Sequence, residues 1–374
     1  MKFVVSSSTL SSNLQVISRV IASKSTIPVL DCFLFELQGN ILKLTAADSE
    51  TRMNTSIEVH DVEGEGVFAV PYKNLLDSLK ELPEQPITFN IDDSTLEILI
   101  YYENGKYNFI GQNGDEYPQP KPLKDKATVI NISAENLLLG IGRSLFAAAE
   151  DELRPVMNGI LFDISEDEIT FVASDGHKLV RYKNLSTKGN NKAAFILPKK
   201  PANLLKAVLP RETGMVTISF DENNAYINME HVVIISRLIE GRYPNYNSVI
   251  PKENPFKITV DRLLFVNALK RVAVFSNQGS SLIKLQLFPN SIFITAQDID
   301  FSTSAEETVS CIYEGEEISI GFKATFLIEI LSNIPSTEVI LQLADPSRAG
   351  LLLPIENETD EDLLMLLMPM MLTD

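Results

Sequence analysis

Six segments of the chain carry apolar residues at the spacing of one helical face. In the first segment, Leu10, Leu14 and Ile17 recur every three or four positions, which predicts an amphipathic helix with its apolar side toward a core. Small polar or acidic residues precede several segments, and we expect Ser133 to cap one of the helices and Thr259 or Asp261 to cap another. The predicted helices are 8–21, 72–82, 134–147, 199–209, 261–275 and 323–333.

Short stretches rich in β-branched and aromatic residues fill the intervals between the predicted helices. CFLFEL (32–37) and ILKLTAA (41–47) are one such pair, and the turn residues QGN separate them. The same order recurs with GILFDI and EITFVAS, and again with LIKLQLF and SIFITAQ. Neighbouring strands joined by tight turns are antiparallel, so the pattern predicts an α+β fold with mainly antiparallel sheets.

The tripeptide Ala-x-Asp follows each of these strand pairs. It stands at Ala46–Asp48, Ala173–Asp175 and Ala296–Asp298, so that the aspartates are 127 and 123 residues apart. Two further landmarks keep this register. At 23 residues beyond each aspartate stand Pro71, Pro198 and Gly321, and at about 70 residues stand Pro118, Pro244 and Pro369. The chain is therefore a threefold tandem repeat.

Each repeat is predicted to open with a helix, continue with strands, and return to a second helix and further strands. Pro71 and Pro198 suit the first turn of the second helix, because the amide hydrogen that proline lacks has no helical partner there. Proline-rich joints at 118–122 and 251–255 separate the repeats. We therefore place three domains at 1–124, 125–252 and 253–374 of the 374 residues.

The formal charge of −18 argues against nucleic acid as a partner, since such binding requires cations that neutralise phosphates. The predicted helices, however, contain eleven basic and five acidic residues, whereas the whole chain contains 32 basic and 50 acidic ones. Lysines on helices are common on solvated faces, and this is the simpler explanation. The alternative is a positive, helix-lined surface that attracts a polyanion while the acidic exterior repels it.

The sequence offers few features of a secreted or membrane protein. No apolar run reaches the ~20 residues that a membrane span needs. The first residues, MKFVVSSSTLSSN, lack the apolar core of a signal peptide. Cys32 and Cys311 lie in different repeats among apolar neighbours, which favours free, buried thiols. We expect a cytoplasmic protein.

Signs of catalysis are weak. Ser174, Asp175 and His177 lie within one turn, whereas hydrolase triads are assembled from separate segments. Phosphate-binding, dinucleotide-binding and zinc-protease motifs are absent from the sequence. The three repeated aspartates occupy equivalent positions of separate repeats, and we expect each to stabilise its own turn rather than to bind a metal. We therefore predict no enzymatic activity, no cofactor and no metal site.

Four motifs resemble the bacterial DNA polymerase sliding clamp family, the beta subunit of DNA polymerase III. They are RPVMNGILF (154–162), SDGHKLVRY (174–182), EGRYPNYNSVIP (240–251) and LLMPMML (366–372). The resemblance covers the chain from end to end. It implies three similar domains per chain and two chains in a ring around duplex DNA, with helices inside and sheets outside.

The resemblance also implies a cleft between the second and third domains that binds partner peptides. Methionine and leucine side chains give such a cleft a plastic apolar lining. Its residues are Arg154, Met157, Ser174, Gly176, His177, Lys178, Leu179, Pro244, Val249, Leu366, Met368, Pro369 and Met370. Ser248 and Met371 stand where the family commonly has a base, so the rim is expected to be less positive.

Two more surfaces follow from the helix charges and from the resemblance. The residues expected to face DNA are Lys24, Lys73, Lys80, Arg143, Lys199, Lys200, Lys206, Lys270 and Arg271. The residues expected at the joint between the two chains are Phe109, Val274 and Phe275, and Gly111 replaces an apolar residue there.

The sequence is best explained by a non-enzymatic processivity clamp. The expected partners are double-stranded DNA without sequence preference, a second copy of the chain, and a DNA polymerase, clamp loader and repair proteins that bind through short linear peptides. Two alternatives remain at this stage. One is a hydrolase-like enzyme built around Ser174, Asp175 and His177, and the other is a monomeric peptide-binding adaptor.

Overall fold

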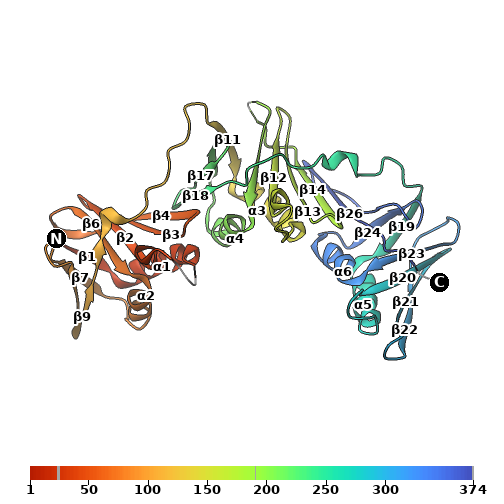
Figure 1. The fold of residues 1–374 in the computed structure, drawn as a ribbon, viewed down its shortest axis with the longest axis horizontal. Helices are drawn as coiled ribbons and strands as arrows, with labels where there is room; N and C mark the ends of the chain where they lie inside the picture. Colours follow the sequence, from red (N-terminus) through yellow and green to blue (C-terminus); the bar gives the residue numbers. More distant parts are fainter. Residues whose placement is uncertain (23–25, 190, 373–374) are drawn as a thin grey trace. The chain divides into compact units, whose positions relative to one another are not determined.

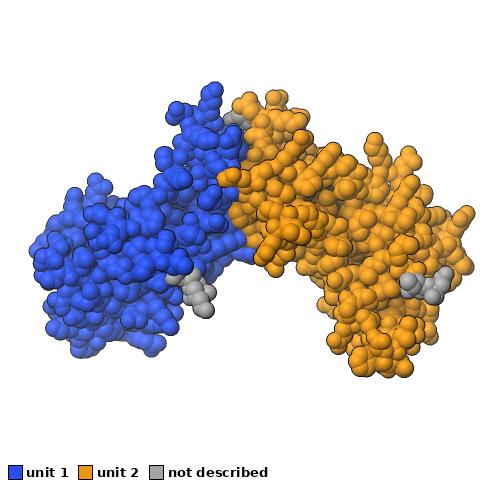
Figure 2. All heavy atoms as spheres, in the orientation of Figure 1, with its two compact units in different colours: residues 1–138, 200–238 blue, residues 139–199, 239–374 orange. Residues whose placement is uncertain are grey.

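The computed structural model describes residues 1–22, 26–189 and 191–372. The chain divides into two compact units (Figure 2). Unit 1 comprises residues 1–138 and 200–238, and unit 2 comprises residues 139–199 and 239–374. The second repeat thus contributes to both units, so this division does not test the predicted domain boundaries. No helix in the described ranges is long and apolar enough to cross a membrane.

All six predicted helices are confirmed, with ends that differ by a few residues. Two begin with expected caps: the side-chain oxygens of Ser133 and, of the two candidates in the third repeat, Asp261 accept hydrogen bonds from the backbone N–H groups of Asn136 (3.2 Å) and Leu264 (2.7 Å). The helices are α1 (Ser7–Ile17), α2 (Tyr72–Lys80), α3 (Ala134–Ser144), α4 (Lys199–Val208), α5 (Arg262–Ala273) and α6 (Ala324–Asn333) (Figure 1).

The start of each repeat was predicted wrongly. A strand, rather than a helix, opens every repeat: β1 (Lys2–Ser6), β11 (Thr128–Ser133) and β19 (Phe256–Asp261). In β1 the side chains alternate, so that Phe3 and Val5 are buried while their neighbours are half-buried. Each opening strand pairs with a strand late in its own repeat, which is a partner that local periodicity cannot reveal.

Pro71 and Pro198 also differ from the prediction, because each ends a strand immediately before its helix instead of occupying the first helical turn. Pro369, the landmark proline of the third repeat, also departs from the predicted register. Pro369 lies two residues beyond its strand, which ends at Leu367, whereas Pro244 lies seven residues beyond a strand that ends at Arg237. The sequence register is therefore only approximately a structural one.

Unit 1 contains two antiparallel sheets. The larger joins the first repeat to the second, because β4 pairs with β18 from Val232↔Thr55 to Ser236↔Thr51. In spatial order its strands are β10 (Gln112–Asn113), β6 (Gly66–Pro71), β2 (Cys32–Gln38), β3 (Ile41–Ala47), β4 (Thr51–Glu58), β18 (Val232–Arg237), β17 (Asn224–Asn228), β16 (Met215–Phe220) and β11. The smaller contains β5 (His60–Glu63), β1, β7 (Pro86–Ile91), β8 (Glu97–Tyr102) and β9 (Gly105–Ile110).

Unit 2 repeats this plan, with a sheet that joins the second repeat to the third. In spatial order this sheet contains β15 (Ala193–Pro198), β12 (Gly159–Ile164), β13 (Ile169–Ser174), β14 (Lys178–Asn184), β26 (Glu361–Leu367), β25 (Gly350–Pro354), β24 (Glu338–Leu343) and β19. The other sheet contains β22 (Thr303–Ser310), β21 (Ser291–Asp298), β20 (Leu282–Phe288) and β23 (Ile318–Lys323). Helices α5 and α6 pack against each other, as α1 and α2 do in unit 1.

The cores are built from the inward-facing side chains of the sheets and helices. Phe3 stacks on Phe89 with ring centroids 4.8 Å apart, and Phe162 stacks on Phe195 at 4.5 Å. Among the described residues both cysteines are free, and Cys32 is buried while Cys311 is half-buried. Burial, together with the nearby Asp31 carboxylate, raises the pKa of the Cys32 thiol to about 11.

Candidate functional site

The three Ala-x-Asp motifs form the same turn, as predicted. The Oδ1 atom of Asp48 accepts hydrogen bonds from the N–H groups two and three residues later, at 2.8 and 2.6 Å. Asp175 does the same at 2.8 and 2.9 Å, and Asp298 at 3.0 and 3.3 Å. Each aspartate therefore stabilises its own turn through hydrogen bonds from the backbone.

The turn at Asp175 does not have the geometry of a hydrolase site. The Ser174 hydroxyl donates to the carbonyl oxygen of Lys178 at 2.8 Å, and its oxygen accepts from the N–H of Gly176 at 3.1 Å. The serine is therefore held by the turn rather than by the imidazole of His177. Gly176 has φ +89°, a conformation that favours glycine.

Strand pairing brings this turn against the end of the chain. β14 pairs with β26 so that Leu179 lies opposite Leu366, and the N–H of Met368 donates to the carbonyl of His177 at 2.8 Å. Leu179 and Leu366 are both buried in one apolar cluster with Leu161, Val172, Ile196, Tyr243, Ala349, Leu351 and Leu364. The junction of the second and third repeats is therefore a continuous sheet over a shared core.

An open pocket of about 600 Å³ lies beside this cluster, and we call it the Met368 pocket. Of the predicted cleft residues, Val249 and Met368 line it, together with Ser248, Ile250, Pro251, Lys252, Glu253, Arg348 and Ala349. The segment 250–253 and the pair Arg348–Ala349 also line the pocket, although neither was predicted from the sequence. The proline-rich composition of 251–255 indicated only a joint, and no motif indicated Arg348.

The other predicted cleft residues divide into floor and rim. Met157, Ser174 and Lys178 are buried like Leu179 and Leu366, whereas Arg154, Gly176, His177 and Pro244 are exposed. Arg154 spans the rim: its Nε donates to Asp151 at 2.8 Å, and its Nη2 to the carbonyl of Asp175 at 3.4 Å. Pro369 and Met370 are half-buried, and the N–H of Met370 donates to the carbonyl of Gly321 at 2.8 Å.

Lys178 joins the turn to helix α6. Its Nζ lies 2.5 Å from Oε2 of Glu329 and 3.6 Å from Oδ2 of Asp175. It also lies 4.6 Å from the ring centroid of Phe326 and 5.8 Å from that of Phe146. Lys178 is thus buried with its charge compensated, and it positions the turn rather than extending into solvent.

The residues predicted to face DNA differ in their exposure and in whether another group of the chain already binds them. Lys73, Lys206 and Lys270 are exposed, and no ion pair engages them within the described part of the chain. Several others are already engaged: Lys80 with Asp77, Lys199 with Glu150, Arg271 with Glu307, and Arg143 with the carbonyl of Asn333. Lys24 lies outside the described residues.

Lys200 occupies a structural position. Its Nζ bonds to the Asp48 carboxylate and to the carbonyl oxygen of Val20 at 2.7 Å. All three residues belong to unit 1. Lys200 therefore connects the first Asp turn to α4, much as Lys178 connects the second Asp turn to α6.

The residues predicted for the joint between chains lie at two surfaces of apolar character. Phe109 is half-buried on β9, the edge strand of its sheet, and the next residue, Ile110, is 66% exposed. A Cβ on Gly111 would lie 2.9 Å from the carbonyl oxygen of Ala69, so that this position has no room for a larger side chain. Val274 and Phe275 are exposed after the end of α5.

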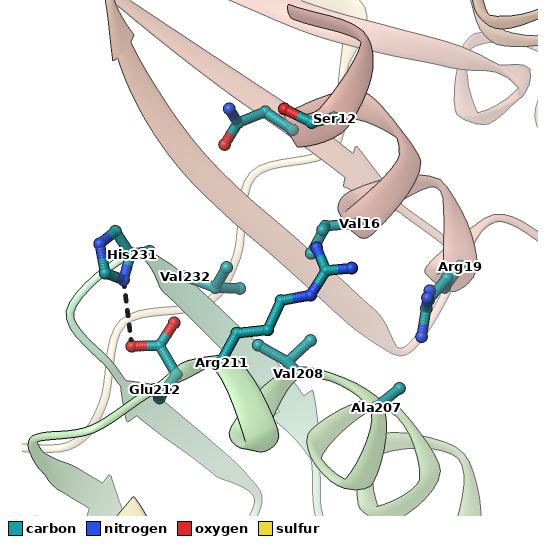
Figure 3. A pocket seen from close by; sticks show the side chains of 10 residues that line it. Ser12, Val16, Arg19, Ala207, Val208, Arg211, Glu212, His231 and Val232 are labelled. Carbon is teal, nitrogen blue, oxygen red and sulfur yellow. Dashed lines mark hydrogen bonds and ion pairs between the residues drawn. The ribbon is translucent and has the colours of Figure 1, made fainter. Parts of the chain in front are cut away.

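A second pocket, of about 280 Å³, lies in unit 1 between α1 and the 3₁₀ helix η6 (Leu209–Arg211), and we call it the α1–η6 pocket (Figure 3). Beside it, ligand-type atoms of Glu212, Glu230 and His231 lie within 4.8 Å of one another. The Glu212 carboxylate already accepts from the N–H of Glu230 at 3.1 Å and contacts the His231 ring at 3.4 Å.

Comparisons with known proteins cover the whole chain. Models of the N-terminal, central and C-terminal domains of the DNA polymerase III beta subunit match residues 1–121, 131–245 and 247–371. The beta sliding clamp of Pseudomonas putida is 28% identical over 374 residues, which is 100% of both chains. That of Synechococcus elongatus is 28% identical over 366 residues, covering 95% of this chain and 96% of the relative.

Solved structures give the same answer. A crystal structure of the DNA polymerase sliding clamp from Pseudomonas aeruginosa is 26% identical and covers 100% of both chains with a TM-score of 0.94. A sliding clamp from Bartonella birtlesii, solved bound to griselimycin, is 27% identical over 100% of both chains with a TM-score of 0.93. The chain therefore belongs to the DNA polymerase III beta subunit family, the beta sliding clamps.

Proposed function

We propose that this clamp closes as a homodimeric ring around duplex DNA and holds short peptides of its partners in the cleft formed by the Asp175 turn and the Met368 pocket. Family membership establishes a three-domain DNA sliding clamp that is a non-catalytic processivity factor of DNA polymerase III. Our proposal adds that the clamp closes as a ring, that its partners bind through peptides, and that particular residues form each surface. Since bacterial replication takes place in the cytoplasm, we expect the chain there.

The observation that carries the cleft assignment is the register of β14 with β26. It places the exposed residues Gly176 and His177 next to Met368, whose N–H is bonded to the His177 carbonyl. Gly176 lacks a side chain where a peptide backbone would approach, and Met368 offers a flexible apolar wall. A polymerase held by such a peptide rebinds DNA as an intramolecular event at high effective concentration.

The cleft can be tested with two methionines close together in the terminal segment. Met368 is 40% exposed and lines the pocket, whereas Met371 is 80% exposed and does not line it. We expect Met368→Glu to weaken a fluorescent peptide with Leu and Phe anchors by about 2 kcal/mol, roughly 30-fold in Kd, as for a hot-spot residue. Met371→Glu is the matched control for the added charge: Met371 is expected at the rim and does not line the pocket, so this variant should lose clearly less affinity than Met368→Glu. Equal anisotropy titrations for the two variants would refute the assignment.

Removal of residues 366–374 would be a less selective test. Leu366 and Leu367 belong to β26 and are buried, so their loss would also open the sheet that joins the second repeat to the third. A point substitution at Met368 leaves every ladder hydrogen bond of β26 in place, and a loss of peptide affinity can then be attributed to the pocket.

The DNA interface rests on the three exposed lysines that no ion pair engages. We expect the triple substitution of Lys73, Lys206 and Lys270 by Glu to reduce retention on DNA and to flatten the salt dependence of binding, because fewer counterions are released. Lys200 is unsuitable for this test, since Lys200→Glu would bring a second carboxylate to Asp48. A charge-matched control replaces the exposed Lys121, Lys126 and Lys188 by Glu. An equal effect of both triple variants would refute the assignment.

A further inference from the structure

The α1–η6 pocket contains two cations that are not among the residues predicted above to face DNA. Arg19 lies in the 3₁₀ helix η1 (Ser18–Val20) after α1, and Arg211 lies at the end of η6. Both line the pocket, and both are exposed. Figure 3 shows Arg211 extending from η6 toward α1, so the two guanidinium groups come from different repeats to one cavity.

Neither guanidinium has an ion-pair partner among the described residues, although the chain holds 50 acidic residues. Glu212 is the acidic residue among those that line the pocket. Its buried carboxylate is directed to the Glu230 N–H and the His231 ring, away from the Arg211 guanidinium (Figure 3). The pocket is therefore a place where positive charge is left uncompensated in an acidic protein.

The remaining lining determines what the pocket can take. The hydroxyl of Ser12 and the amide of Asn13 both donate to the carbonyl of Thr9, at 3.0 and 2.9 Å, and the two guanidinium groups are the permanently charged donors of the lining. Val208 and Val232 form an apolar floor, and low-dielectric walls strengthen the attraction of an anion. The planar fork of arginine matches the oxygens of a phosphate in a bidentate way.

We propose that the α1–η6 pocket binds a phosphate group between Arg19 and Arg211. Its volume of about 280 Å³ suits one phosphate with the atoms attached to it, and is small for a large cofactor. Two sources share this chemistry. One is a backbone phosphate of the DNA that the clamp encloses, which rests on the function proposed above, and the other is a free phosphate compound.

The test compares Arg19→Gln/Arg211→Gln with Lys121→Gln/Lys126→Gln, a control that also removes two exposed cations from unit 1. Inorganic phosphate is titrated calorimetrically at constant ionic strength, and affinity for a duplex oligonucleotide is measured at several salt concentrations. We expect the arginine variant to lose at least about tenfold in phosphate affinity, whereas the control keeps it. Circular dichroism checks that both variants fold.

The two arms also distinguish the sources. If DNA supplies the phosphate, the slope of log K against log salt falls by about 1 in the arginine variant and stays unchanged in the control. Loss of phosphate binding with an unchanged slope supports the site and assigns it to a free compound. A wild-type protein that binds no phosphate, or an arginine variant that binds it as well as the control, overturns the proposal. Failure of the clamp function would appear separately, as wild-type protein that does not stay on closed circular DNA.

Discussion

Substitution of Lys178 by Met tests how the cleft is held in place. Methionine keeps an unbranched apolar side chain against Phe326 and Phe146 but removes the charge, which leaves Glu329 and Asp175 without their cation. The His177 carbonyl that accepts from Met368 lies in the same turn. We therefore expect the turn, the end of β26 and the pocket wall to loosen together.

The size of the effect follows from burial. Removing one member of a buried pair costs roughly 3–5 kcal/mol, whereas an exposed pair contributes about 0–1 kcal/mol. The Lys178 side chain is 7% exposed and that of Glu329 is 39% exposed, so water can solvate the carboxylate in part. The pair lies between the two limits, and we expect a loss of about 2 kcal/mol, roughly 30-fold in a local opening equilibrium.

Hydrogen exchange of the β14 and β26 amides is the suitable assay, because it reports local opening of these strands. Global unfolding is less suitable, since a chain with two compact units need not unfold in a single two-state transition. Lys178→Met should speed this exchange about 30-fold. Lys178→Met/Glu329→Gln should recover part of the loss, since no unpaired carboxylate is left. Lys183→Met is the control in the same strand: the Lys183 side chain is 27% exposed against 7% for Lys178, and its partner Glu168 keeps a hydrogen bond from the Thr170 hydroxyl at 3.3 Å, so we expect a smaller effect. Unchanged exchange in Lys178→Met, or no recovery in the double variant, would refute this reasoning.

Three further outcomes are expected. Phe275→Asp would bury a charge in the joint between chains and should yield monomers by light scattering, whereas a wild-type mass would refute its place there. The Arg271 guanidinium holds the pKa of Glu307 below its ordinary 4.5, so this pair stabilises the folded state above that pH and its contribution disappears as pH falls through the lowered pKa. Glu307→Gln should therefore lower Tm near neutral pH and lose less Tm than the wild type on acidification; parallel Tm curves would contradict this. Cys32, with its raised pKa and full burial, should resist alkylation at neutral pH until the protein unfolds, and should react more slowly than Cys311.

Features that depend on residues close together in the sequence could be predicted. The six helices followed from apolar spacing, and the cap at Ser133 from the residue types that precede a helix, which also narrowed the cap of α5 to Thr259 or Asp261. The Asp48 turn and its two counterparts followed because an aspartate side chain bonds to backbone N–H groups two and three residues later. These interactions are short-range, and a repeat makes each of them visible three times.

Features that depend on distant partners could not be predicted in this way. The opening strand β1 has only five residues, and its partner β7 begins 84 residues after β1 does. Lys178 was predicted only as a cleft residue, and its ion pair was missed because nothing local indicates Glu329, which lies 151 residues further on. Likewise, Lys200 read as a DNA contact although Asp48 engages it. Charge counts along a helix give the sign of a surface but not which cations are already paired.

Retention on DNA of different topology tests the central claim most directly. A ring that encloses DNA without contacting particular bases stays on a closed circle and leaves through the ends of the same molecule once it is linearised. We predict that the wild-type chain, once loaded, co-elutes with nicked circular DNA in gel filtration and is lost when a restriction enzyme cuts that DNA. Equal retention on the circular and the linear form would contradict a ring and indicate binding in an open groove.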